Sequence, residues 1–201
     1  MGRVRGQWRN LRDGGLAPGS VPAAVLEQIR IVNTATVAII VIGLGALVQY
    51  ITIGLLPMVL AVLAAVTIGI GNIVLLRATH EPWLAGHVAQ LTLFALLVCS
   101  NLHSGGFYDP NFGWLYVLPL LGGVLNGFRV GWIWCGIVLV TTVAFWAAPQ
   151  LGFPVPDAVP ADLHAQQSLF NRLSAVLAVS VVGSAFVLAN RRTQEELKRS
   201  A

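Results

Sequence analysis

The chain has 201 residues, of which 56% are hydrophobic and only 10% are charged, and its formal net charge is +4. Soluble domains carry about 25% charged residues, so this composition excludes an ordinary soluble protein. No Asp, Glu, Lys or Arg occurs in residues 31–76, 83–108, 110–128 or 130–156. A membrane-crossing helix needs about 20 apolar residues, whereas barrel strands alternate in polarity over about 10 residues, a pattern missing here. The sequence therefore predicts an all-α, polytopic membrane protein.

Six transmembrane helices are predicted along the chain. In order, they occupy residues 31–52, 55–76, 83–103, 112–128, 130–148 and 168–190. The first apolar run is too long for a cleaved signal peptide, so we expect it to be retained. Before it, residues 1–29 form a basic arm that either lies on the anionic membrane surface or only fixes the topology. Ser20 and Pro22 favour a helix start shortly before the first span.

The basic residues indicate the orientation of these helices. If both termini are cytoplasmic, Arg172 is the only one of the twelve Lys and Arg residues that lies outside. Membrane proteins concentrate Lys and Arg in their cytoplasmic loops, so we expect both termini to be cytoplasmic. The positive net charge is then a feature of topology, and no nucleic-acid partner is expected.

Two further segments outside the spans have distinct compositions. Residues 149–167 contain four prolines and predict an extended, stiff segment, which either covers the outer end of the helices or is a plain connector. Residues 191–201 are polar and rich in good helix formers, so they predict the start of a cytoplasmic signalling helix. That helix either leads into an output domain absent from this sequence or docks a partner.

Polar and small residues within the spans predict how the helices pack. Polar side chains in a membrane tend to face the bundle interior and to bond neighbouring helices. Several such side chains lie within the predicted spans, among them Asn33, Asn72, His87, Gln90, Asn101 and Asn126. Small residues four apart, such as Gly123 and Gly127, permit close helix approach, either within one bundle or in a homodimer. We expect Pro119, Gly122 and Gly123 to form a hinge in the helix at 112–128.

Catalytic motifs are missing from this sequence. It contains no phosphate-binding loop, no HExxH motif, no CxxC pair and no assignable Ser/His/Asp set. The spacing of His103, Asp109, Asp162 and His164 matches no known ligand pattern, so no metal site is predicted. No acidic residue lies within a predicted span, which argues against ion-coupled transport.

The loop 103–114, HSGGFYDPNFGW, is the strongest candidate for a binding site. Its glycines leave backbone N–H groups uncovered, its polar side chains offer donors, and its aromatic rings offer flat apolar faces. This chemistry suits a quinone, whose ring carbonyls accept hydrogen bonds. The alternative is a Gly-Gly turn, a helix cap at Asp109 and interfacial aromatic residues. The candidate ligand-binding residues are Asn101, His103, Gly105, Gly106, Tyr108, Asp109, Pro110, Asn111 and Trp114.

The same loop resembles one in a known family. Six helices, cytoplasmic ends and Gly-Gly-x-x-polar-Pro in the outer loop between the third and fourth helices resemble the membrane domain of bacterial sensor histidine kinases. The likeness is greatest to the RegB/PrrB type, whose loop carries GGxxNPF and is linked to ubiquinone sensing. Gly105, Gly106 and Pro110 match that motif, Asp109 replaces its asparagine, and Asn111 replaces its phenylalanine. The stretch PLLGGVLNGFRVGWIW also looks like this broader group.

The resemblance implies a sensor domain at residues 30–190 in the bacterial inner membrane. Its signal would be ubiquinone, another quinone or a small lipophilic molecule, sensed at the loop and relayed through the helix at 168–190. The implied partners are the lipid bilayer, a second copy of the chain, and an output domain or response regulator. Two alternatives remain: the membrane anchor of a nucleotide cyclase, and a structural or assembly subunit of a membrane complex.

Overall fold

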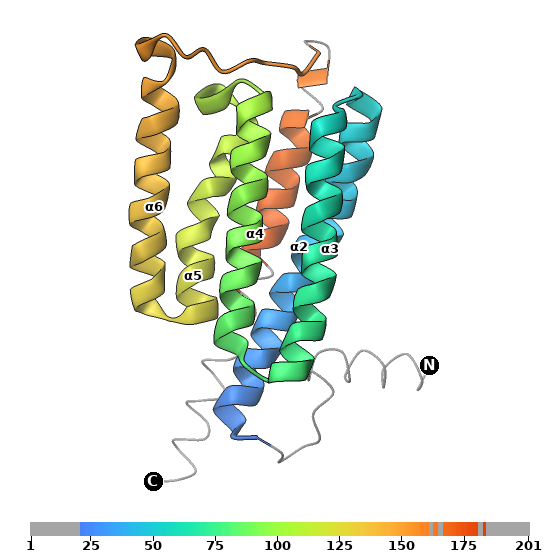
Figure 1. Ribbon diagram of the computed structural model, residues 1–201, viewed down its shortest axis with the longest axis vertical. Coiled ribbons are helices and arrows are strands. Elements are labelled where there is room, and N and C mark those ends of the chain that lie inside the picture. Colours follow the sequence, from blue (N-terminus) through green and yellow to red (C-terminus); the bar gives the residue numbers. More distant parts are fainter. Residues whose placement is uncertain (1–20, 161–162, 165–166, 181–182, 184–201) are drawn as a thin grey trace.

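The structure, a computed structural model, describes residues 21–160, 163–164, 167–180 and 183 (Figure 1). Its long helices are α2 (Ala23–Ile53), α3 (Leu56–Thr79), α4 (Pro82–His103) and α6 (Phe128–Ala147), and α5 (Leu118–Asn126) is short. Three 3₁₀ helices are η1 (Gly106–Tyr108), η2 (Pro110–Val117) and η3 (Pro149–Leu151). Residues 167–180 form a further helix. The described part of the chain contains no strand, which confirms the predicted all-α class.

Several of the helices have membrane character. α2, α3, α4 and α6 are long and apolar enough to cross a membrane. The first of them begins at Ala23 rather than at the predicted residue 31, with Pro22 as its N-cap. The earlier start extends a buried face, because Ile29 packs with Leu76 and Ala85. Pro22 thus marks the helix start as predicted, while Ser20 lies outside the described residues.

The fourth predicted helix, at 112–128, is not one α-helix. Residues 110–117 form the 3₁₀ helix η2, and only Leu118–Asn126 is α-helical. Pro119 explains the change, since it has no N–H to donate to Leu115, and Leu118 N–H donates to the Leu115 carbonyl instead. A 3₁₀ helix rises about 2.0 Å per residue and an α-helix about 1.5 Å, so η2 and α5 together extend about 30 Å.

The fifth predicted helix is α6, and it packs closely against α5. The α5–α6 turn lies at Gly127, which has φ 94° and ends α5. Beyond the turn, a Cβ on Gly131 would lie 3.1 Å from the Gly123 Cα, and one on Gly122 would lie 2.9 Å from Trp134 Cδ1. These glycines therefore bring the two helices together within one chain. The predicted hinge at Pro119, Gly122 and Gly123 stays a prediction.

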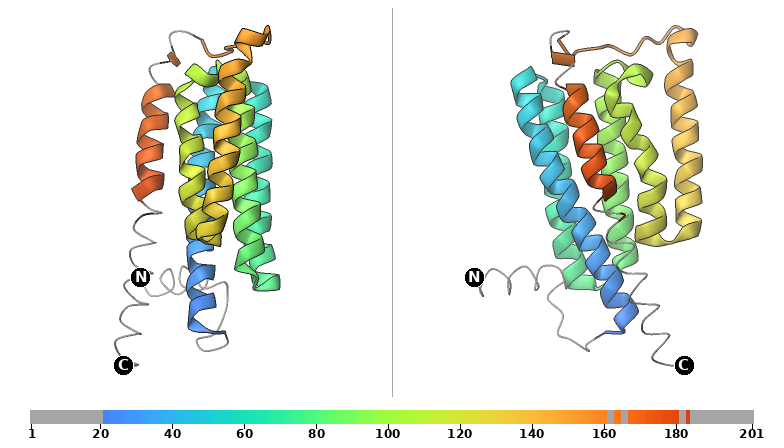
Figure 2. Two further views of the ribbon diagram at one scale, coloured as in Figure 1. Left: turned by 90° about the vertical axis from the view of Figure 1, so that its left-hand side faces the viewer. Right: turned by 180° about the vertical axis from the view of Figure 1, so that it is seen from behind.

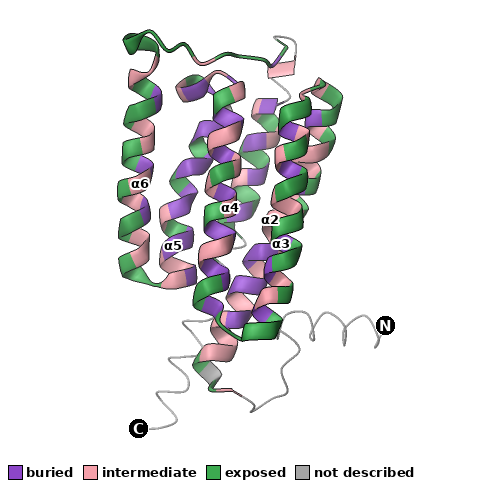
Figure 3. Ribbon diagram, viewed as in Figure 1, coloured by how far each residue is buried: buried purple, intermediate pink, exposed green. Residues whose placement is uncertain are grey.

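α4 lies between α3 and α5 in Figure 1 and contacts α2, α3 and α5. Its buried residues recur every three or four positions: Pro82, Ala85, Gly86, Ala89, Gln90, Leu93, Leu97, Ser100 and Asn101. Figure 3 shows buried residues facing inward on the helices and exposed, largely apolar residues facing outward. Exposed apolar surface on the outside of a helical bundle is what a lipid-facing protein presents.

Two of the polar residues in the spans bond neighbouring helices, as predicted. The Asn72 side-chain amide donates to the Ala85 carbonyl over 2.9 Å, which links α3 to α4. The Gln90 amide donates to the Leu118 carbonyl over 2.8 Å, which links α4 to α5. His87 is half-buried and stacks edge-on against Trp83.

A linker, residues 149–160, crosses one end of the bundle from α6 towards the helix at 167–180 (Figure 1). We call this end the linker end. The turns between α3 and α4 and between α5 and α6 lie at the opposite end. The predicted basic arm up to residue 20, the signalling helix at 191–201 and the second half of the last span lie outside the described residues.

Candidate functional site

The Gly-Gly loop is paired with the linker. Ser104 and Asp157 form an isolated antiparallel bridge, Gly105 N–H donates to the Pro156 carbonyl over 3.1 Å, and Ala158 N–H donates to the His103 carbonyl over 2.9 Å. The backbone N–H groups that the glycines were expected to offer a ligand are thus partly covered by the chain itself. The linker is therefore a cover for this end of the bundle rather than a plain connector.

The geometry of Gly106 explains why glycine occupies this turn. Gly105 and Gly106 have φ angles of 91° and 67°, which L residues rarely adopt. A Cβ on Gly106 would also lie 3.1 Å from the Cβ of Val155 in the linker. Turn geometry and close approach of the linker both require glycine, so Gly105 and Gly106 form a Gly-Gly turn.

Asp109 caps η2, as that alternative also predicted. Its side chain accepts hydrogen bonds from Asn111 N–H over 2.6 Å and from Asn111 Nδ2 over 3.3 Å. The residue is only 5% exposed, and burial raises the pKa of its carboxyl from 3.8 to about 6. The bonds from Asn111 oppose this rise, the nearby Asp157 adds to it, and His164 opposes it. His164 Nε2 lies 3.4 Å from Asp157 Oδ2, so Asp157 in the linker and His164 just after it lie together near this cap.

The structure does not bring the predicted loop residues into one site. Asn101 Nδ2 donates to the Leu97 carbonyl over 2.7 Å, and His103 Nδ1 lies 2.8 Å from the Cys99 carbonyl oxygen, so both side chains are used within α4. Pro110 begins η2. Four other candidates line two separate hollows, one inside the bundle and one beneath the linker, whereas Gly106 and Asp109 line neither.

The hollow beneath the linker has a volume of about 270 Å³. It is lined by Gly105, Phe107, Tyr108, Phe145, Trp146, Pro149, Gln150, Pro154 and Val155. Tyr108 is 85% exposed, so its ring lies at the surface instead of closing a binding site. This hollow uses two of the candidates, Gly105 and Tyr108.

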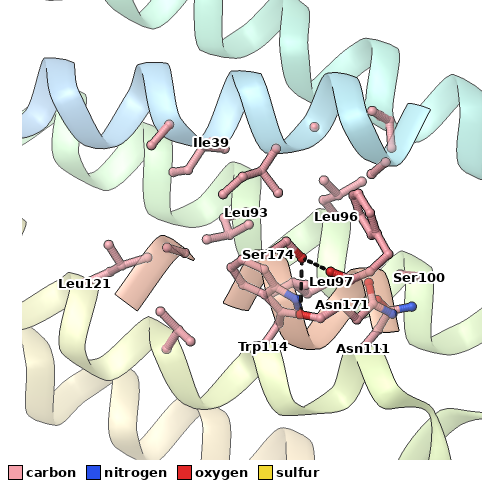
Figure 4. A pocket seen from close by; sticks show the side chains of 18 of the residues that line it. Ile39, Leu93, Leu96, Leu97, Ser100, Asn111, Trp114, Leu121, Asn171 and Ser174 are labelled. Carbon is pink, nitrogen blue, oxygen red and sulfur yellow. Dashed lines mark hydrogen bonds between the residues drawn. The ribbon is translucent and has the colours of Figure 1, made fainter. Parts of the chain in front are cut away.

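The second hollow is a cavity in the middle of the bundle, between α2, α4, η2, α5 and the helix at 167–180 (Figure 4). Its volume is about 80 Å³. Two of the predicted residues, Asn111 and Trp114, line it. Apolar side chains form most of its wall, including Ile39, Ile42, Leu93, Leu97, Val117, Leu121 and Phe170.

The polar groups of the cavity gather at one end. In Figure 4, Ser100, Asn111 and Asn171 lie on one side of the cavity and Leu121 lies on the other. Tyr50 Oη and Ser100 Oγ are 2.9 Å apart and hydrogen-bonded. Ser174 Oγ donates to the Phe170 carbonyl over 2.7 Å. The cavity therefore has an apolar body and one polar end.

One polar group in this cavity has no partner. Asn171 is 5% exposed, and its Nδ2 makes no hydrogen bond within the described part of the chain. A buried donor left unbonded costs about 1–3 kcal/mol, so such a group marks a place where an acceptor belongs. Asn171 lies on the helix at 167–180, which was expected to relay the signal.

Sequence reasoning missed Tyr50, Ser100, Asn171 and Ser174 as site residues. From the sequence alone, Tyr50 is typical of an interfacial aromatic residue and Ser174 is typical of a small residue at a helix contact. The signal that points to Asn171 is an amide inside a predicted span, which is the criterion that identified Asn72 and Gln90.

The described residues offer no candidate metal site, and comparison with known proteins assigns the chain to no family. Among the described residues no group of three or more His, Cys, Asp or Glu side chains could hold a metal ion, and Asp162 lies outside them. No protein-family model, curated protein or solved structure matches this chain. The resemblance to RegB/PrrB-type kinases rests on the loop motif and the predicted spans, and it stays a prediction.

Proposed function

We propose that this chain is the membrane sensor domain of a signalling protein in a bacterial inner membrane. It has six spans and cytoplasmic termini, and its central cavity binds a quinone or a similar small lipophilic carbonyl compound. Binding changes the position of the helix at 167–180, and that helix passes the change to a cytoplasmic output domain. The observation that carries the proposal is the unpartnered Nδ2 of Asn171, buried in an otherwise apolar cavity.

The described residues support the six-span topology in two ways. The combined length of η2 and α5, about 30 Å, equals the thickness of a bilayer core, so a segment too short as an α-helix is long enough. In addition, Arg77 lies in the last turn of α3 and Arg129 in the first turn of α6, at the end opposite the linker, while Arg172 lies in the helix that starts at the linker end. This distribution fits a cytoplasmic end opposite the linker.

Cysteine labelling tests this topology. Leu151 at the linker end is 72% exposed, and Phe128 at the other end is 76% exposed. In a background lacking Cys99 and Cys135, a membrane-impermeant maleimide added to intact spheroplasts should label Leu151→Cys and leave Phe128→Cys unlabelled. Labelling of Phe128→Cys alone would reverse the orientation.

The polar end of the cavity suits a carbonyl oxygen. An unpartnered amide donor needs an acceptor, and the two oxygens of an oxidised quinone only accept, whereas a reduced quinol also presents donors. The apolar body of the cavity suits the rest of such a ligand. A domain that distinguishes these two redox forms can report the redox state of a membrane quinone pool.

The size of the cavity supports a coupling between binding and helix position. An engineered cavity that binds benzene in another protein measures about 150 Å³, whereas this cavity measures about 80 Å³. A quinone ring therefore enters only if the surrounding helices separate. A ligand that binds one helix arrangement better than another shifts the population towards it, which is the requirement for a sensor.

Binding of a short-chain quinone tests the proposal. Trp114 lines the cavity, so its fluorescence should be quenched when the quinone binds to protein in nanodiscs. Asn171→Leu keeps the side-chain size and removes the donor, which should weaken binding about tenfold, the equivalent of a hydrogen bond of about 1.4 kcal/mol. The matched control is Asn72→Leu, which removes an equally buried amide elsewhere in the bundle and should leave affinity unchanged. Failure of the wild type to bind, or equal affinities for Asn171→Leu and wild type, would refute the assignment.

A further inference from the structure

A groove opens on the side of the bundle between the last turns of α2 and the beginning of the helix at 167–180. The right-hand view of Figure 2 shows these two helices beside each other. The groove is lined by Gly45, Val48, Gln49, Thr52, Ile53, Leu163, Gln167 and Phe170. Its volume is about 400 Å³, within the range of about 300–1,000 Å³ that is typical of ligand pockets. Val48 is 66% exposed, so the groove opens towards the lipid.

Two amide groups in this groove have no partner. Gln167 is only 2% exposed, and its Nε2 makes no hydrogen bond within the described part of the chain. The buried Nε2 of Gln49 is also without a partner there. In contrast, Thr52 Oγ1 donates to the Val48 carbonyl over 2.9 Å. A buried N–H group without an acceptor costs free energy, so both amides favour an acceptor that enters the groove.

The depth of these amides identifies the acceptor available to them. Gln49 lies one helical turn, about 6 Å, before the end of α2 at Ile53. That depth corresponds to the boundary between the apolar core and the polar interface of a bilayer. The ester groups that join acyl chains to glycerol lie at this boundary, and their carbonyl oxygens accept hydrogen bonds.

We propose that this groove is a phospholipid site in which the side-chain amides of Gln49 and Gln167 donate hydrogen bonds to the ester carbonyls of one bound lipid. The acyl chain lies against the apolar side chains of Val48, Ile53 and Phe170. The site is distinct from the central cavity, and it requires no quinone binding.

Phe170 separates the two sites. It lines both the groove and the central cavity, and its ring packs on Gly45, where a Cβ would lie 3.3 Å from Phe170 Cε2 and Cζ. A lipid in the groove therefore contacts the same side chain that forms a wall of the cavity. Through this contact, bound lipid holds the helix at 167–180 in place against α2.

Retention of lipid by the purified protein tests the proposal. The full chain is exchanged into a mild detergent, incubated with phosphatidylglycerol, and analysed by native mass spectrometry. The diacyl lipid is compared with its dialkyl ether analogue, which has the same headgroup and phosphate but no carbonyls. We expect one diacyl lipid to be retained and the ether analogue to bind at least tenfold more weakly. Equal retention of both lipids would overturn the proposal and assign any binding to the headgroup phosphate or to the acyl chains alone.

Substitutions identify the site within the protein. The double variant Gln49→Leu, Gln167→Leu keeps the side-chain volumes and should lower diacyl lipid affinity about tenfold, to the level of the ether analogue. The matched control is Gln150→Leu, an exposed glutamine in η3 at the same end of the bundle, which should retain lipid like wild type. Undiminished retention by the double variant contradicts the proposal. The comparison of ester and ether lipids needs only wild-type protein, so the proposal is tested even if the double variant does not fold.

Discussion

Replacement of Asp109 by Asn probes the cap that holds the loop. Burial raises the pKa of this carboxyl from 3.8 to about 6, so the folded protein binds the proton more tightly than the unfolded chain does. Between these two pH values the folded state carries more protons, and the free energy of unfolding falls as the pH rises. Below pH 3.8 the Asp109 carboxyl does not lower the free energy of unfolding, and above pH 6 it lowers this free energy by a constant amount.

The magnitude follows from the pKa shift. A shift of about two pH units corresponds to about 3 kcal/mol, of which about 2 kcal/mol is lost between pH 4.5 and 7.5. Asn is also a good N-cap, so Asp109→Asn keeps the bond from Asn111 N–H. It disturbs the weaker bond from Asn111 Nδ2, worth about 1 kcal/mol. Asp109→Asn should therefore stabilise the protein by about 2 kcal/mol at pH 7.5.

The assay is equilibrium unfolding in mixed micelles at pH 4.5 and pH 7.5. The difference between wild type and Asp109→Asn isolates the contribution of this carboxyl. His164→Gln is the necessary control, because His164 faces Asp157 and histidine side chains in general change charge between these two pH values. A wild-type protein that gains stability from pH 4.5 to 7.5 relative to Asp109→Asn would refute the reasoning, since that sign requires a lowered pKa.

Two pairs of glycine substitutions test the packing of the loop and of α5 against α6. Gly106→Ala should lower the free energy of unfolding by about 2–3 kcal/mol, because the alanine would have a strained φ and would contact the linker. Gly152→Ala should lower it by about 1 kcal/mol, because Gly152 also has a positive φ, 84°, but nothing lies within 4 Å of its Cβ position. Equal losses in unfolding free energy would show that the linker does not press on the loop. Gly122→Ala should cost about 1–3 kcal/mol, because its Cβ would lie 2.9 Å from Trp134 Cδ1 in α6 and 2.6 Å from Gln90 Nε2 in α4. Gly136→Ala has open space and should change stability by less than about 0.5 kcal/mol, so a similar loss in both variants would contradict this account.

The positions of the helices were predictable because they depend on local composition. Uncharged runs long enough to cross a bilayer predicted α3 at 55–76, and the structure has it at Leu56–Thr79. The cap at Asp109 and the turn at Gly105 and Gly106 were also predictable, since both follow from the conformational preferences of single residues.

The remaining features depend on tertiary contacts that a local pattern does not contain. Pro119 predicted a hinge in the fourth span. The 3₁₀ form of η2, however, depends on the hydrogen bond that Leu118 N–H donates to the Leu115 carbonyl next to that proline. The pairing of the loop with the linker joins residues more than fifty positions apart, which no short motif encodes. The unpaired amides of Asn171 and Gln167 became visible only when their surroundings were known, because an amide in a span is usually bonded to a neighbouring helix.

A distance measurement tests the central claim, that ligand binding moves the helix at 167–180, most directly. Leu44 on α2 and Leu177 are 47% and 55% exposed, so spin labels on cysteines at these positions should not disturb the core. A reference pair on α3 and α6, at Ile70 and Leu139, is 54% and 60% exposed. In nanodiscs, a saturating oxidised quinone should lengthen the distance between Leu44 and Leu177 and leave the reference distance unchanged. Quinone bound in the cavity with neither distance altered would contradict the account.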